Sequence, residues 1–360
     1  MTTRAVQTNE TATGAVARSM AAGREAGGGA AIGVGPRAGT GIGTGAGAGI
    51  GIGTGRRVLR VAALVATLPY LCLKGAWVAG SRIGIPDGSV LLEPGMFFKA
   101  ANAITMAMDA AVMVLVLVFT RPWGRRVPSW LLTVPVFLAT GLLAPIVVAF
   151  PAQLLLGAVG LGPDAVAQAA KEPFLDPWVF NVVYGGFIVQ AIALAGLFVP
   201  YARERWGSRW QGVQGERLPS PTGVVAAAAS VSAVIVAAMH LIWAFGGTAG
   251  LSASQISQFS PQTGAVYATH GICVLAAGAG AVNLARGGTG QARWALAVAW
   301  IGAAEAVGWG LWLLVSTMGV TDPAKEVTTV MVLTYAGQTI TGLLAAFVLA
   351  RFLASRRRTG

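Results

Sequence analysis

The sequence predicts an all-α fold, a polytopic membrane bundle of eight transmembrane helices built as two four-helix parallel repeats. Three observations carry this prediction. The 360 residues are 55% hydrophobic and only 11% charged, a composition typical of multi-pass membrane proteins. Eight apolar stretches of about 20 residues, the length that crosses a bilayer core, follow a glycine-rich start. Patterns in the first four stretches recur in the last four.

The strong positive charge of the chain belongs to its loops. The formal net charge is +12 and the pI is near 10.8, which at first indicates a nucleic-acid partner. The arginines, however, cluster in short connections beside apolar spans, which is the pattern that orients membrane proteins. We therefore expect the membrane lipid bilayer, and no nucleic acid, as a partner.

Residues 1–55 are rich in Gly, Ala and Thr and are predicted to be a disordered cytoplasmic tail. Their run GIGTGAGAGIGIGTG is not expected to bind phosphate, because a phosphate-binding loop follows a strand and opens a helix within a βαβ unit. No apolar segment precedes Gly55, so no cleaved signal peptide is expected.

Eight predicted spans follow the tail in two groups of four. They lie near Val58–Ala79, Met96–Thr120, Val127–Phe150, Trp178–Tyr201, Val224–Phe245, Ala265–Ala285, Trp294–Met318 and Thr328–Arg351. Residues 56–201 form the first four-helix half and residues 224–351 the second. A basic cytoplasmic linker, residues 202–223, joins the halves, and a basic cytoplasmic tail, residues 352–360, ends the chain.

Basic residues mark one side of the predicted membrane. The loops before the odd-numbered spans and both chain ends are rich in arginine, namely Arg56, Arg57, Arg60, Arg121, Arg125, Arg126, Arg203, Arg205, Arg209, Arg217, Arg286, Arg293, Arg351, Arg356, Arg357 and Arg358. The opposite loops carry little beyond Arg82, Lys171 and Lys325. The positive-inside rule therefore places both termini in the cytoplasm of an inner (plasma) membrane.

An internal repeat is visible at the ends of the first and fifth spans. The first span reads Lys74-x-x-Trp77-x-x-Gly80-x-x-x-Gly84, and the fifth has the same spacing from His240 through Trp243 and Gly246 to Gly250. The third and seventh spans both begin at a Trp, and the fourth and eighth share Tyr-x-Gly. Because four is an even number of spans, the two halves are predicted to be parallel repeats about an axis along the membrane normal.

Glu305 is the strongest candidate for function. It lies near the middle of the predicted span Trp294–Met318. An ionised carboxylate at that depth costs roughly 2.5–3.5 kcal/mol on insertion scales, so such a residue turns inward, finds a partner or keeps its proton. Trp309 and Trp312 follow on the same helix face. We assign Glu305, together with Asp109, as candidate catalytic acids.

Other polar side chains also lie within the predicted spans. The second span carries Lys99, Asn102, Met106, Asp109 and Met113 along one face. The candidate substrate-binding residues are Trp77, Lys99, Asn102, Tyr184, His240, Trp243, His270, Trp309, Trp312 and Gln338. They fall between the membrane midplane and the outer surface. This placement predicts a Trp-lined polar cavity in the outer half, closed at its base by Asp109 and Glu305.

Each of these candidates also has a structural interpretation. Lys74 and Lys99 can extend to the outer head groups, and the tryptophans can form an interfacial belt. His240 and His270 can be hydrogen-bonded interior residues, and Asp109 can be part of a structural polar pair. The sequence contains no HExxH, Walker A, CxxC, GxSxG or DDxxD motif, so neither a metal site nor a cofactor is predicted.

The segment LPYLCLKGAWVAGSRIGIPDGS, followed by NAITMAMDAAVMVL, resembles a family of eight-helix integral membrane proteins of actinobacteria. The resemblance covers residues 56–351, with markers at Lys74, Trp77, Asn102, Asp109 and the PIVVAF stretch around Pro145. More remotely, the layout is similar to bacterial membrane-bound terpene cyclases. That resemblance implies isomerase or lyase chemistry on an apolar, isoprenoid-like molecule, with Glu305 or Asp109 as the acid.

Three functions remain open from the sequence. The first is an enzyme, an acid-initiated terpene cyclase, in which tryptophan faces stabilise a carbocation and a dry cavity excludes water. Against it, the predicted cavity opens outward, whereas prenylated metabolites are usually made in the cytosol. The second is a proton-coupled transporter of a small molecule, which suits parallel repeats with an acid between them. The third is a non-catalytic membrane scaffold.

Overall fold

Eight long helices dominate the computed structural model, which describes residues 46–92, 96–170, 174–318 and 327–356. All eight are long and apolar enough to cross a membrane, so the predicted all-α membrane bundle is confirmed. Their bounds are α1 Ala46–Val78, α2 Met96–Thr120, α3 Ser129–Ala158, α5 Pro177–Trp206, α6 Thr222–Ala244, α8 Pro261–Arg286, α9 Ala292–Thr317 and α10 Thr329–Ser355. Residues Gly47–Gly360 form one compact unit of the chain.

Helix α1 begins earlier than the sequence predicts. Residues 46–55, the last part of the expected disordered tail, are helical, while the rest of that predicted tail, residues 1–45, lies outside the described residues. Several of the other long helices begin with common N-terminal features, a capping hydroxyl or a proline in the first turn. The hydroxyl oxygens of Ser260 and Thr328 accept backbone N–H bonds at the starts of α8 and α10, and Pro177 and Pro261 occupy the first helical turn.

Short elements fill the connections between the long helices. They are the helices α4 Ala165–Ala170 and α7 Ala253–Ser257, the 3-10 turns η1 Val90–Leu92, η2 Pro122–Arg126 and η3 Gly207–Arg209, and the strands β1 Val213–Gly215 and β2 Gly288–Gln291. The two strands pair antiparallel and tie the connection after α5 to the connection after α8. Arg356, at the end of α10, donates to the carbonyls of Gln211 and Val213. The sequence gives no alternating pattern for strands this short, so the pairing was not predicted.

Small residues allow the helices of the second half to pack closely. A Cβ on Gly302 of α9 would lie 2.3 Å from the backbone nitrogen of Ala277 in α8, and one on Gly280 of α8 would lie 2.6 Å from Cα of Ala299. Helices α6, α8, α9 and α10 all contact one another closely except for the pair α6 and α9. Such small-residue contacts are how membrane helices gain van der Waals packing without a hydrophobic driving force.

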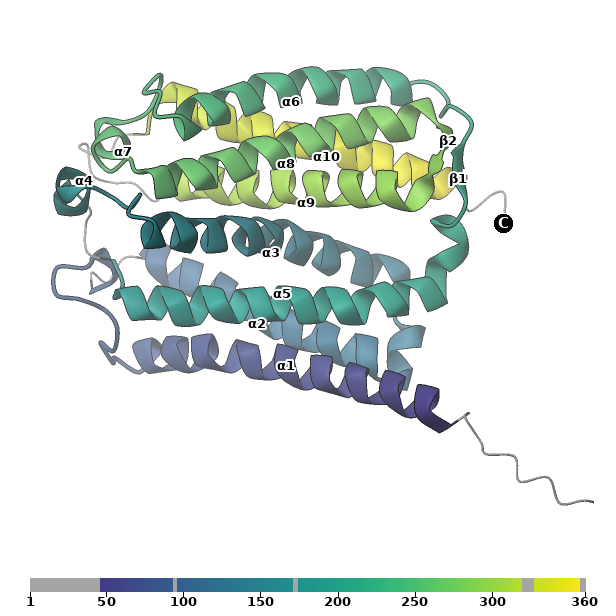
Figure 1. The fold of residues 1–360 in the computed structure, drawn as a ribbon, viewed down its shortest axis with the longest axis horizontal. Coiled ribbons are helices and arrows are strands. Elements are labelled where there is room, and N and C mark those ends of the chain that lie inside the picture. The colour runs from purple at the N-terminus through teal and green to yellow at the C-terminus, as the bar shows by residue number, and fades with distance from the viewer. Residues whose placement is uncertain (1–45, 93–95, 171–173, 319–326, 357–360) are drawn as a thin grey trace, which may run out of the picture. The chain divides into compact units, whose positions relative to one another are not determined.

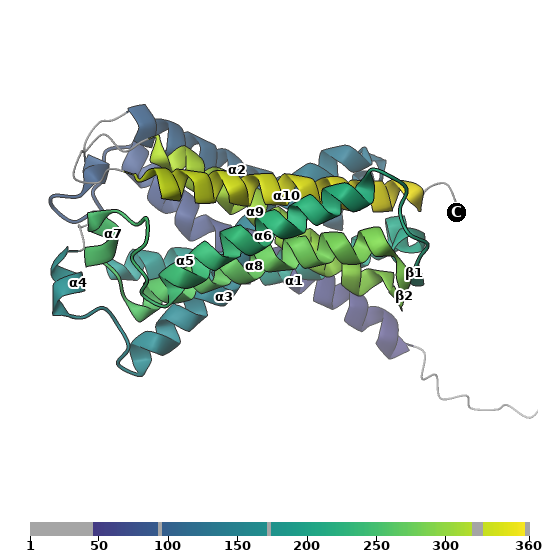
Figure 2. The same cartoon turned by 90° about the horizontal axis from the view of Figure 1, so that it is seen from above.

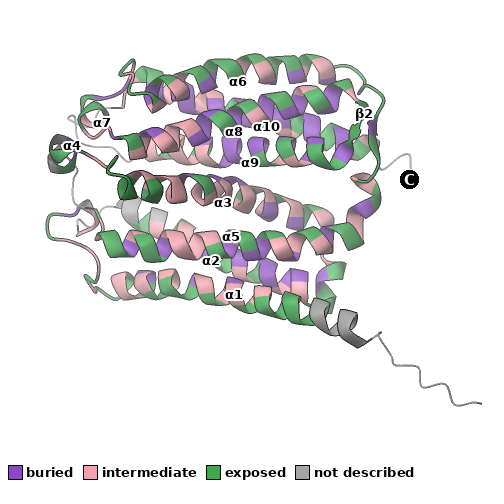
Figure 3. Ribbon diagram, viewed as in Figure 1, coloured by how far each residue is buried: buried purple, intermediate pink, exposed green. Residues whose placement is uncertain are grey.

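Helix α3 connects the two halves. It contacts α2 and α5 of the first half and α8 and α9 of the second, and it lies between them in Figure 1. Figure 2 shows the same helices from above. The approach to α9 is tightest at Gly141, where a Cβ would lie 2.0 Å from the carbonyl oxygen of Ala304. Buried positions are more frequent in α8, α9 and α10 than in α1, α3 and α5, as Figure 3 shows. The second half is therefore the better-packed core.

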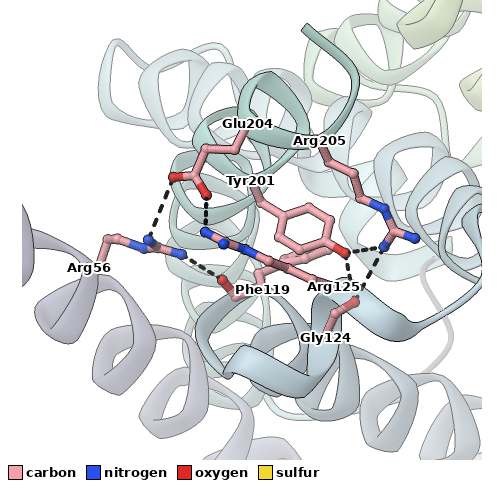
Figure 4. A network of polar contacts seen from close by, with 7 residues as sticks. All are labelled: Arg56, Phe119, Gly124, Arg125, Tyr201, Glu204 and Arg205. Atoms are coloured by element: carbon pink, nitrogen blue, oxygen red, sulfur yellow. Dashed lines mark hydrogen bonds and ion pairs between the residues drawn. The ribbon is translucent and has the colours of Figure 1, made fainter.

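The predicted cytoplasmic loops of the first half meet in one polar network (Figure 4). Arg125 of η2 donates to the Glu204 carboxylate at 2.9 Å, and Arg56 of α1 lies 3.8 Å from its other oxygen. The Tyr201 hydroxyl donates to the carbonyl of Gly124 at 2.9 Å and accepts from Arg205 at 2.5 Å. The start of α1, the α2–α3 connection and the end of α5 thus lie at the same end of the bundle.

The two segments with the repeated sequence pattern end their helices alike. The Trp77 indole N–H donates to the carbonyl of Ile83, and the Trp243 indole N–H donates to the carbonyl of Ala249, each at 2.8 Å. The paired glycines have matching positive φ angles, 87° and 81° at Gly80 and Gly246, and 72° and 74° at Gly84 and Gly250. These angles favour glycine. The duplication of the whole half stays a prediction.

Candidate functional site

Glu305 lies in the interior of the second half, in the middle of α9. Its side chain is 0% exposed. The Oε1 atom lies 2.6 Å from Nδ1 of His270 in α8 and accepts the Gln338 side-chain N–H from α10 at 3.2 Å. A buried carboxyl group needs such partners because it loses its hydration. The expectation that this acid turns inward and is paired is therefore met.

His240 extends this arrangement to a fourth helix. Its Nε2 atom lies 2.9 Å from the Oε1 atom of Gln338. Because an amide oxygen can only accept, Nε2 carries the hydrogen and the other nitrogen of a neutral ring is an acceptor. We call His240, His270, Glu305 and Gln338 the histidine–glutamate cluster. It joins α6, α8, α9 and α10 through three hydrogen bonds.

Two atoms of the histidine–glutamate cluster lack a partner. They are Oε2 of Glu305 and Nδ1 of His240, both buried and without a hydrogen bond to any described residue. An unsatisfied buried polar atom costs free energy of about 1–3 kcal/mol. These two atoms are therefore the unsatisfied polar positions of the cluster, and each needs a physical explanation.

Aromatic rings surround the histidine–glutamate cluster. The His240 ring has its centroid 5.4 Å from that of Trp243 and 6.3 Å from that of Tyr267. The His270 ring lies 5.3 Å from Trp309, whose indole N–H donates to the carbonyl of Leu142 in α3 at 3.1 Å. His240, His270 and Glu305 are all buried, so the cluster lies away from solvent.

A second polar cluster lies in the first half, between α1 and α2. Lys74 donates to the Asn102 side-chain oxygen at 3.3 Å and to the Thr105 hydroxyl, and its Nζ lies 4.6 Å above the Tyr70 ring. Asp109 lies one turn after Thr105 on α2, and its buried Oδ2 has no hydrogen-bond partner among the described residues. We call Lys74, Asn102, Thr105 and Asp109 the lysine–aspartate cluster.

Burial decides between the two interpretations of the lysines. Lys74 is only 2% exposed, because its partners Asn102 and Thr105 lie on α2 inside the bundle. It therefore does not extend to the outer head groups. Lys99 is exposed, in agreement with that interpretation. Sequence reasoning treated the two lysines alike because spacing alone does not reveal which one has a polar partner across the helix interface.

Tyr184 belongs to an aromatic wall in the first half. Its ring stacks on Phe150 with the centroids 5.1 Å apart and on Phe180 at 6.0 Å, and it meets Phe187 edge-on at 6.1 Å. Phe187 in turn contacts Tyr70 at 5.2 Å. The wall therefore reaches the lysine–aspartate cluster rather than Glu305.

The sequence predicts one chamber closed by both acids, and this shared chamber stays a prediction. No hydrogen bond or ion pair among the described residues joins the histidine–glutamate cluster to Lys74, Asn102 or Asp109. The physical reason is the packing, since α2 lies against α3 and α5 whereas α9 lies against α3, α8 and α10.

The predicted tryptophans do not all lie at one site. Trp77 and Trp243 use their indole N–H groups on helix-terminal carbonyls, which is a structural use. Trp309 contacts His270. Trp312 is partly exposed one turn further along α9. Only Trp309 and Trp243 therefore lie against the histidine–glutamate cluster.

Sequence reasoning missed a polar cavity of about 230 Å³ at the other end of the bundle from the arginine network. Its lining comes from the end of α3, from α4 and α7, and from the start of α8, and consists of Gln153, Pro163, Ala167, Gln255, Gln258, Ser260, Gln262, Thr263 and Tyr267. The signal available in the sequence was the run of glutamines between α6 and α8. Tyr267 belongs both to this lining and to the rings around His240.

Comparisons with known proteins do not extend these findings. The chain matches no protein-family model, no curated protein and no solved structure. We therefore infer the function from the geometry of the clusters and of the cavity.

Proposed function

We propose that this multi-pass membrane protein is a proton-coupled carrier of a small molecule, and that Glu305 is the group that gains and loses the proton. One observation carries the proposal, the fully buried histidine–glutamate cluster that spans four helices. Ionisable residues at membrane depth that face the bundle interior are typical of proton relays in pumps and transporters.

The geometry of the cluster suits a proton exchange. The 2.6 Å contact between His270 Nδ1 and Glu305 Oε1 accommodates a carboxylate with an imidazole N–H, or a carboxylic acid with an imidazole acceptor. Either form keeps the hydrogen bond, and the proton moves by a fraction of this distance. Gln338 holds Oε1 from the other side, which fixes the carboxyl group in place for the transfer.

Exchange at Glu305 has a structural consequence for the bundle. Its partners come from α8 and α10, and α10 also holds α6 through His240 and Gln338. A change in the charge of Glu305 therefore changes the interaction of three helices at once. In a carrier, that coupling is what joins protonation to movement of one group of helices against another.

The proposal includes an orientation. The arginine-rich start of α1, the α2–α3 connection and the end of α5 meet at one end of the bundle, and α10 ends at β1. We place this end, with both termini, on the cytoplasmic side of the inner membrane by the positive-inside rule. The glutamine-lined cavity then faces outward.

An acid-initiated terpene cyclase is the second candidate. The aromatic rings around His240 and His270 favour it, because their faces stabilise a carbocation derived from an isoprenoid-like substrate. It ranks second for two reasons. Glu305 is fully enclosed by protein, and the ammonium of Lys74 next to Asp109 repels a cation formed at the other acid. A non-catalytic scaffold would use the same contacts for stability alone.

The test uses Glu305→Gln and a matched control. Glu204→Gln makes the same change at an exposed site of α5. Each variant is reconstituted in liposomes with an acid exterior and a metabolite mixture, and the accumulated solutes are identified by mass spectrometry. We expect gradient-dependent accumulation with the wild type and with Glu204→Gln, and at least a tenfold loss with Glu305→Gln.

Two other outcomes overturn the carrier. A cyclised terpenoid that appears in membrane extracts and disappears with Glu305→Gln supports the cyclase. If Glu305→Gln changes neither accumulation nor terpenoids and only lowers the unfolding temperature, the scaffold is supported and both active functions are excluded.

A further inference from the structure

We propose that the polar cavity at the outer end is the substrate site, and that it takes a small uncharged molecule bearing hydroxyl or amide groups. This inference rests on the proposed carrier function and adds the substrate class to it. We call the cavity the glutamine pocket, after Gln153, Gln255, Gln258 and Gln262 in its lining.

The lining of the glutamine pocket is polar but uncharged. Seven of the nine lining residues carry an amide or a hydroxyl group, and none is Asp, Glu, Lys or Arg. An ion placed here would lose hydration without gaining an opposite charge. An apolar guest would leave amide groups without partners. A glutamine side chain has an oxygen that accepts hydrogen bonds and an NH₂ group that donates them. A molecule that both donates and accepts hydrogen bonds can therefore pair with both groups.

Part of the pocket is a fixed frame. Gln153 of α3 donates to the carbonyl of Gln262 at 3.4 Å, and Gln262 of α8 donates to the carbonyl of Gln153 at 3.0 Å. These two reciprocal hydrogen bonds join the last turns of α3 to the first turn of α8. Gln258 is held by the hydroxyl of Ser254 at 3.1 Å. The frame therefore exists before a ligand arrives.

Gln255 carries an acceptor that lacks a partner. Its side-chain oxygen is buried and has no hydrogen-bond partner among the described residues, and the same residue lines the pocket. A turn of the Gln255 amide would bring this oxygen to a ligand hydroxyl or amide N–H and would satisfy the acceptor. That gain gives the pocket a preference for ligands that can donate a hydrogen bond.

The size of the pocket limits the ligand further. Its volume of about 230 Å³ lies below the roughly 300–1,000 Å³ that holds a drug-sized molecule. The ligand is therefore no larger than a short polyol, a monosaccharide or a simple amide.

Tyr267 links the glutamine pocket to the histidine–glutamate cluster. This side chain lines the pocket, and its ring contacts those of His240 at 6.3 Å and Trp243 at 5.5 Å. A ligand that moves Tyr267 therefore displaces the ring next to the histidine–glutamate cluster. This contact is the physical route by which substrate binding and protonation of Glu305 are coupled.

The experiment measures binding to the full-length protein in nanodiscs by calorimetry and by the shift of Tm. The probes are glycerol, xylitol, glucose, myo-inositol, urea and acetamide, compared with glutamate, lysine, choline and octanol. We expect at least one uncharged polar probe to bind and no charged or apolar probe to do so. Binding only by a charged or apolar probe, or no binding by any of the six uncharged polar probes, would overturn the proposal.

Three variants locate the bound probe. Gln255→Ala removes the free acceptor and is expected to weaken binding at least fivefold. Ala167→Leu adds bulk to the same lining and is expected to abolish binding. Gln168→Ala changes an exposed glutamine next to it and is expected to alter the Kd less than twofold. Equal weakening by Gln255→Ala and Gln168→Ala would place the probe elsewhere and refute the site.

Glu305→Gln separates this inference from the carrier proposal. The variant keeps the pocket lining intact, so binding should stay within twofold of the wild type while proton-coupled uptake is lost. Binding at the pocket without any proton-coupled uptake in the wild type would refute the carrier and leave the binding site standing. Uptake of charged solutes alone would refute the pocket and leave the carrier standing.

Discussion

The two halves of the molecule end their first helices with the same turn but hold different polar interiors. Trp77 and Trp243 make the same bond to a carbonyl six residues later. Three residues before these tryptophans the first half has Lys74 and the second has His240. Lys74 donates to neutral side chains of α2, whereas His240 belongs to a chain of hydrogen bonds that reaches the carboxyl group of Glu305 through Gln338.

This difference shows that two helices can end in the same turn and still place different polar side chains in the interior. Glycine and alanine contacts bring α8, α9 and α10 close together around the imidazole and amide groups of the histidine–glutamate cluster. In the first half, Lys74 instead lies against the Tyr70 ring and donates to Asn102 and Thr105. The two halves therefore hold different buried polar groups below the same helix-end turn.

The largest expected effect comes from breaking the histidine–glutamate cluster. His270→Leu leaves the buried Glu305 without its closest partner, and we expect a loss of about 3–5 kcal/mol in the free energy of unfolding. Lys74→Leu in the first half should cost about 1–3 kcal/mol, because Lys74 makes hydrogen bonds but no direct ion pair with Asp109. Denaturation in detergent, followed by circular dichroism, measures both.

The double variant His270→Leu, Glu305→Leu is the control for this prediction. Removal of both polar groups should recover part of the loss, because an apolar pair leaves no uncompensated group in the interior. A double variant less stable than His270→Leu alone, or equal losses for His270→Leu and Lys74→Leu, would contradict the contrast between the halves.

The next effect concerns the contact between the halves. Gly141→Ala places a methyl group 2.0 Å from the Ala304 carbonyl oxygen, and the backbone there cannot yield easily, so we expect a loss of about 1–3 kcal/mol. Gly185→Ala in α5 meets no atom within 4 Å and should gain up to about 1 kcal/mol, since alanine favours a helix. Effects of the same sign in Tm measurements would show that α3 and α9 do not meet as described.

A smaller effect tests the shared turn. Trp77→Phe and Trp243→Phe each remove one indole-to-carbonyl hydrogen bond, and each should cost about 0.5–1.5 kcal/mol, with the larger value at the fully buried Trp243. Trp130→Phe, at an exposed position in α3, is the matched control and should leave Tm unchanged. If only one of the two turns is sensitive, the resemblance of the halves is confined to sequence.

The smallest effect is expected at the cytoplasmic network of the first half. Glu204→Gln removes the ion pairs to Arg56 and Arg125. Because these side chains are substantially exposed to solvent, the loss should be about 0–1 kcal/mol and should vanish at high salt. A loss as large as that of His270→Leu would place the stabilising electrostatics at the surface and not in the interior.

Much of this architecture follows from the sequence. All eight spans were predicted within a few residues of most helix ends, because about 20 apolar residues have no other way to satisfy their backbone in a bilayer. Glu305, His240, His270 and Gln338 were each singled out as polar residues at membrane depth. The glutamine pocket was missed, since its walls come from four separate elements and no local pattern marks a cavity.

The sequence by itself determined that the chain crosses a membrane eight times, which side its arginines mark, and that Glu305 needs a partner in the interior. Only the tertiary structure decided which partner each acid has. Hydrogen bonds reach about 3 Å, so a shift of one helix by a single turn, 5.4 Å, would exchange those partners. The packing of glycine and alanine between α8, α9 and α10 sets that register, and this is why Glu305 meets His270 and Gln338.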